Sequence, residues 1–134
     1  MRLAVLLVPA VLIATACSTT GATVELSPLG GSGVRGTATL TAVDGGTEAS
    51  VDVQGLPAGT TARVTLHGGT CSMLGASAAQ VAELHAGAKG QAQGGGPILF
   101  RGTEKVTLVD IADNAHVLVV EGLNHPLACG PISP

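Results

Sequence analysis

Beyond the first twenty residues, apolar and polar side chains alternate with a period of two, in short runs separated by glycine-rich turns. In the run from Val34 to Ala42, three threonines share one face, opposite Ala38 and Leu40. A period of two is typical of a strand with one buried and one exposed face. The chain is therefore predicted to be all-β.

The turn signals set the spacing of these runs. Asp44-Gly45-Gly46 is a hairpin signal, and Leu56-Pro57-Ala58-Gly59 predicts another turn. Between residues 68 and 96 the alternation weakens, and the alanine-rich stretch from Ser77 to His85 predicts a helical turn. The strands we expect cover residues 23–26, 34–42, 49–54, 63–67, 98–100, 116–121 and 127–132. This spacing predicts a β-barrel or sandwich of seven or eight strands.

Large core side chains are scarce. Phe100 is the only aromatic residue among 134, so the core must be built from alanine, valine and leucine. A domain of this size gains little net stability from such a core, and a covalent crosslink would contribute a large share.

The pattern of the N-terminus indicates an export signal. A charged start and a short apolar stretch lead to Ala14-Thr15-Ala16-Cys17, which resembles the lipobox of bacterial lipoproteins, with Ala14 in place of the usual leucine. We expect a signal peptide at 1–16 and a lipidated Cys17 with a tether at 17–32. The protein is then exported and lipid-anchored to a cell membrane or outer envelope, on a periplasmic or extracellular face. Cleavage without acylation and a membrane-spanning anchor are the alternatives.

The three cysteines agree with this reading. If Cys17 carries lipid, Cys71 and Cys129 remain as partners for a disulfide in an oxidising compartment. Two buried free thiols are the alternative.

The charge pattern argues against a nucleic-acid partner. The net charge is −3, and the basic residues beyond Arg2 are scattered singly. There is no basic patch and no aromatic platform on which bases stack. The expected partner is the membrane, through the lipid anchor.

Three stretches resemble the copper/zinc superoxide dismutase family. They are the hairpin from Gly33 to Leu40, the turn and strand from Gly55 to Cys71, and the ending from Leu127 to Ile132. The most specific element is the Ala-Cys-Gly ending, which carries the second disulfide cysteine of that family. The resemblance implies a superoxide dismutase-like Greek-key barrel over residues 33–134, closed by Cys71 and Cys129.

The metal-ligand positions depart from the family. Its copper strand carries His-x-His, whereas the matching face here offers Arg63, Thr65 and His67. Glu121 stands where the family has another copper histidine, and the segment matching the zinc loop contains only His85. The family places the positions of His67 and Glu121 in one site, so these two are the candidate metal ligands.

We therefore expect no catalytic residue and no cofactor, and favour a non-catalytic binding or structural module. The alternative is a copper-binding protein, or a weak dismutase, with a smaller set of metal ligands. Its site would join His67 and Glu121 with His116 or His125. A third possibility is an adhesive module like the chordin-type repeat domains, although these do not require the Ala-Cys-Gly ending. The alternation places His67 on the polar face of its strand, so replacing it is expected to change stability little.

Overall fold

The computed structural model describes residues 9–10 and 20–134. Cys17 and, apart from residues 9–10, the expected signal peptide lie outside the described residues. Within them the chain forms ten strands and one helical turn: β1 (Gly21–Pro28), β2 (Arg35–Val43), β3 (Gly46–Gln54), β4 (Thr61–Thr70), β5 (Met73–His85), β6 (Ala92–Pro97), β7 (Leu99–Phe100), β8 (Glu104–Lys105), α1 (Leu108–Ile111), β9 (His116–Glu121) and β10 (Pro126–Pro131).

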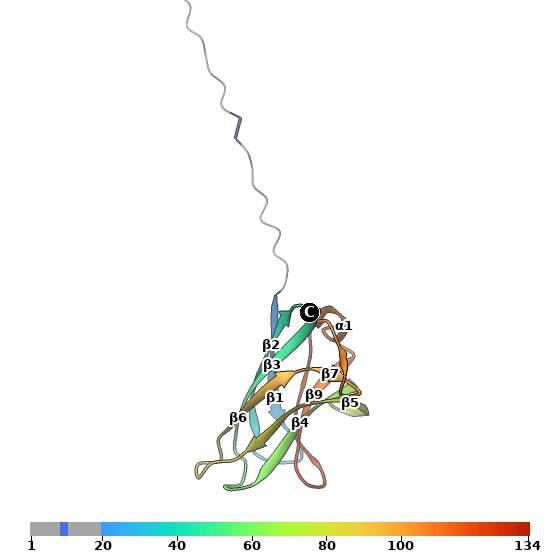
Figure 1. The fold of residues 1–134 in the computed structure, drawn as a ribbon. Coiled ribbons are helices and arrows are strands. Elements are labelled where there is room, and N and C mark those ends of the chain that lie inside the picture. The colour runs from blue at the N-terminus through green and yellow to red at the C-terminus, as the bar shows by residue number, and fades with distance from the viewer. Residues whose placement is uncertain (1–8, 11–19) are drawn as a thin grey trace, which may run out of the picture.

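Eight strands form one antiparallel sheet in the order β5-β4-β9-β10-β1-β2-β3-β6 (Figure 1). The terminal strands β5 and β6 contact each other, so the sheet curls into a nearly closed barrel. The links from β3 to β4 and from β6 to β9 both join strands that are not neighbours, which is the Greek-key pattern. The predicted all-β barrel is confirmed.

The barrel interior is filled by small aliphatic side chains. Ala38 and Leu40 of β2, Leu66 of β4 and Leu118 of β9 have no exposed surface. The threonines that alternate with Ala38 and Leu40, namely Thr37, Thr39 and Thr41, are exposed, as the alternation predicts. The hairpin signal is also confirmed, since Val43 pairs with Gly46 across a two-residue turn in which Gly45 has a φ of 70°.

The predicted helical turn at 77–85 is wrong. This stretch belongs to the long strand β5, which pairs with β4 from Thr61↔His85 to Thr70↔Met73. Alanine has the highest helix propensity, but propensity is a weak determinant of structure, and pairing with a neighbouring strand overrides it. The alternation was hidden because β5 has an extra residue where the register shifts between Val64 and Thr65 and again between Leu66 and His67, and these bulges interrupt the period of two.

The expected boundary between tether and domain is also wrong. Strand β1 lies inside the range assigned to the tether and pairs with β2 from Gly21↔Thr41 to Leu26↔Gly36. The amide of Ala42 donates a hydrogen bond to the carbonyl oxygen of Thr20 at 2.8 Å. The chain is therefore hydrogen-bonded to the sheet from Thr20 onward. Strand β1 lies between β2 and β10 and is part of the barrel.

The one helical segment described is short. α1 spans four residues, and no helix within residues 9–10 and 20–134 is long and apolar enough to cross a membrane.

The Ala-Cys-Gly ending has a different structural role at each position. Ala128 faces the barrel interior, and Cys129 faces outward in a disulfide with Cys71. A side chain at Gly130 would collide with the carbonyl oxygen of Glu25 in β1. A larger residue at that position would push β10 away from β1, so glycine permits the close approach of these two strands.

Candidate functional site

The antiparallel pairing of β4 with β9 brings the two candidate ligands together. His67 pairs with Val117 and Arg63 with Glu121, so their side chains share the outer face of the barrel. The His67 Nε2 and Glu121 Oε1 atoms lie 2.7 Å apart. This is a direct contact, with no space for an ion between the two side chains.

Every polar atom of the His67 ring has a partner in the fold. Nδ1 lies 3.0 Å from the carbonyl oxygen of Gly75, and Nε2 also lies 2.9 Å from the hydroxyl of Thr65. A carbonyl oxygen only accepts, so Nδ1 donates to Gly75. Nε2 contacts both the carboxylate of Glu121 and the hydroxyl of Thr65, and its role as donor or acceptor depends on the tautomer of the ring. Both ring nitrogens are therefore engaged by hydrogen-bond partners within the fold.

The polar face of β4 is covered at its centre, so the small effect expected from replacing His67 no longer follows. His67 is only 9% exposed and Thr65 is buried as well. The tip of the β4–β5 hairpin, residues 68–75, which we call the covering segment, lies against this face: Gly75 contacts His67, and Cys71 is bonded to Cys129 of β10. A second apolar cluster forms beneath it, outside the main core, and consists of Val117, Val119, Cys129, Leu29, Cys71 and Leu74.

The other histidines do not join His67. His85 is 72% exposed and lies beside Glu83, and His116 hydrogen-bonds Asp113 at 2.9 Å. The hydrogen bond from His116 is the main cause that lowers the pKa of Asp113 below its usual value. His125 lines a surface hollow of about 280 Å³ that Glu121 also lines.

The residues present do not fit the metals of the resembled family. Copper and zinc sites in proteins take three or four nitrogen, sulfur or carboxylate ligands. Within the described part of the chain, no group of three or more His, Cys, Asp or Glu residues is placed to hold a metal ion. The His67–Glu121 pair supplies one imidazole and one carboxylate, both engaged in hydrogen bonds.

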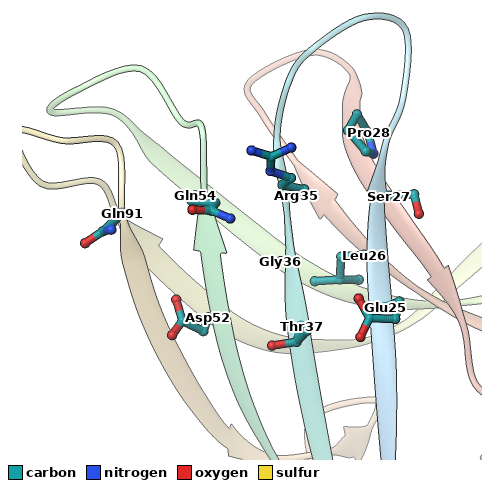
Figure 2. Close-up of a pocket in the computed structure, with 10 residues that line it drawn as sticks. All are labelled: Glu25, Leu26, Ser27, Pro28, Arg35, Gly36, Thr37, Asp52, Gln54 and Gln91. Carbon is teal, nitrogen blue, oxygen red and sulfur yellow. The ribbon is translucent and has the colours of Figure 1, made fainter.

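A second candidate is a polar groove on the outer face of β1, β2 and β3, shown in Figure 2. Its volume is about 520 Å³. Glu25, Thr37 and Asp52 form one row across the three strands, because Glu25 pairs with Thr37 and Thr37 with Asp52. Arg35 and Gln54 pair in the next row. The groove thus offers carboxylates, a hydroxyl, an amide and a guanidinium side by side.

The sequence analysis missed this groove. The alternation showed that these side chains point outward, and that was the only available signal. It predicted a strand at 23–26 but did not show that this strand lies beside β2, and the expected domain boundary left Glu25 in the range of the tether. No protein-family model matches the chain, and no curated protein matches it.

Proposed function

We propose that the protein is an envelope-anchored, superoxide dismutase-like barrel that acts as a non-catalytic binding or structural module. One observation carries this proposal. The side chains at the candidate copper positions, His67 and Glu121, bond each other and the surrounding fold. The hydrogen bond between His67 and the carbonyl oxygen of Gly75 holds the covering segment onto β4, which is a structural role.

The polar groove is the candidate binding surface of such a module. It lies on the half of the barrel far from the start of β1, since it is lined by the last residues of β1 and the first of β2. A protein anchored through Cys17 would present this half away from the membrane. Donors and acceptors in two adjacent rows suit a polar ligand that forms several hydrogen bonds at once.

The alternative function is copper binding at a site that has fewer ligands than the copper site of the resembled family. The 2.7 Å contact between His67 and Glu121 favours it, because two candidate ligands are already adjacent. Binding there must first break the hydrogen bond between Nε2 and Oε1. It also leaves the copper with one imidazole and one hard carboxylate, whereas Cu(I) prefers softer ligands.

We expect no superoxide dismutase activity after copper loading beyond that of the same concentration of free copper. Dismutation requires a copper that cycles between two oxidation states in a fixed set of ligands, and this chain presents two ligands. The measurement is superoxide consumption together with elemental analysis of the dialysed protein. The matched variant is His67→Gln, checked for its fold by circular dichroism, and its activity should equal that of the wild type. Stoichiometric copper with strong activity that disappears in His67→Gln would refute the non-catalytic proposal.

For the anchor, we expect metabolic palmitate labelling to mark the protein and Cys17→Ala to release it into the soluble fraction. Acyl chains hold a protein to a membrane because each buried CH₂ contributes about 0.8 kcal/mol. The variant should keep its disulfide, because Cys71 and Cys129 pair with each other. A wild-type protein that is soluble and unlabelled would contradict acylation.

A further inference from the structure

Exposed apolar side chains lie at both ends of the barrel, and those at the end where the chain enters it are of interest because of their position. This end, which we call the α1 end, holds the start of β1, the β2–β3 hairpin, α1 and the C-terminus (Figure 1). Val109 of α1 is 82% exposed, and Val43 at the end of β2 is 45% exposed. Single exposed apolar residues are common, but Val109 also lines an apolar hollow, and a contiguous apolar surface can mark a contact with a partner or a membrane.

Such a hollow lies at the α1 end. Its volume is about 140 Å³, and its lining consists only of apolar residues: Ala22, Leu108, Val109, Ala112 and Pro134. The charged neighbours Asp44 and Asp110 are acidic, and the side chain of Lys105 reaches the carbonyl oxygen of Asp44. Acidic side chains do not attract an anionic surface. A contact made by this end must therefore be mainly apolar.

The reach of the N-terminal segment places this end close to any lipid on Cys17. Thr20 is hydrogen-bonded to Ala42, and only two residues lie between Thr20 and Cys17. Three fully extended steps span about 11 Å. A lipid on Cys17 would therefore hold the α1 end against the headgroup region, while the 122–125 turn at the opposite end stays remote.

We propose that the α1 end rests on the lipid surface, with Val109 and Val43 in the interfacial region. This inference rests on the anchoring part of the proposed function. The contact gives the barrel one orientation, in which the polar groove faces away from the membrane. The occupant is a lipid surface because the hollow is apolar and opens at the end nearest the anchoring cysteine.

The test uses tryptophan fluorescence, because the chain has no tryptophan of its own. Val109→Trp places a reporter at the α1 end, and Leu123→Trp places a matched reporter at the opposite end, where Leu123 is 94% exposed. The exported mature protein is reconstituted in phosphatidylcholine vesicles containing brominated lipid. If Cys17 proves to be a free thiol, the protein is coupled there to a maleimide lipid, so a failure of acylation leaves this test intact.

We expect brominated lipid to quench the Val109→Trp emission at least twofold more than the Leu123→Trp emission. Equal quenching, stronger quenching of Leu123→Trp, or no quenching of either would overturn the proposal. Emission of Val109→Trp that shifts to the blue without quenching would indicate a second copy of the chain at this end, and would also overturn it. Amide hydrogen exchange of the wild type provides a check without mutation: attachment to vesicles should slow residues 107–112 and leave 122–125 unchanged.

Discussion

Reduction of the Cys71–Cys129 disulfide is expected to lower the free energy of unfolding by about 4 kcal/mol and the Tm by more than about 10 °C. The two cysteines are 58 residues apart, and opening a loop of that length returns conformational entropy to the unfolded chain. The crosslink also holds the covering segment over Val117 and Val119. The measurement is thermal unfolding with and without reductant, with peptide mapping of the thiols.

The matched control for this prediction is Cys17→Ala, which should leave the Tm and its response to reductant unchanged. The Cys71→Ala/Cys129→Ala variant should unfold near the reduced wild type. A reduced protein with an unchanged Tm would mean that the remaining core holds the fold by itself, and the prediction would be wrong.

We expect His67→Ala to lower the free energy of unfolding by about 2–3 kcal/mol, because it removes a buried ring and leaves Thr65 and Glu121 without their partner. Chemical denaturation measures this change. His85→Ala is the matched control, since that side chain is 72% exposed and its loss should change stability by less than about 0.5 kcal/mol.

Glu121→Gln separates the charge from the hydrogen bond. A glutamine has the same size, and its amide can accept from Nε2 or donate to it, so we expect a loss smaller than that of His67→Ala. Equal stability of His67→Ala and His85→Ala would show that the His67 network adds nothing to the fold. That result would remove the main support for a structural role and favour the copper-binding alternative.

The position of His67 shows where sequence reasoning stops. The alternation correctly assigned its side chain to the polar face of β4, and the resemblance to superoxide dismutases placed Glu121 in the same site. Neither showed that this face is covered rather than open to solvent. A period of two shows which side chains share a face, but the segment that covers the face comes from elsewhere in the chain.

Strand β5 and the groove illustrate the same limit. The alanine-rich composition predicted a helical turn, but this stretch forms a strand because it pairs with β4. Bulges in the pairing hid the alternation. The sequence showed the polar residues of the groove separately for each strand, without showing which strands are neighbours. Only the placement of β1 beside β2 brings Glu25 next to Thr37.

By itself, the sequence determined the all-β class, the small aliphatic core, the hairpin at Asp44-Gly45 and the pairing of Cys71 with Cys129. These depend on local side-chain periodicity, on turn chemistry and on the number of cysteines. The tertiary structure decided that β1 belongs to the barrel, that His67 is buried and bonded, and where the groove and the α1 end lie. These depend on contacts between segments far apart in the chain, which no local pattern encodes.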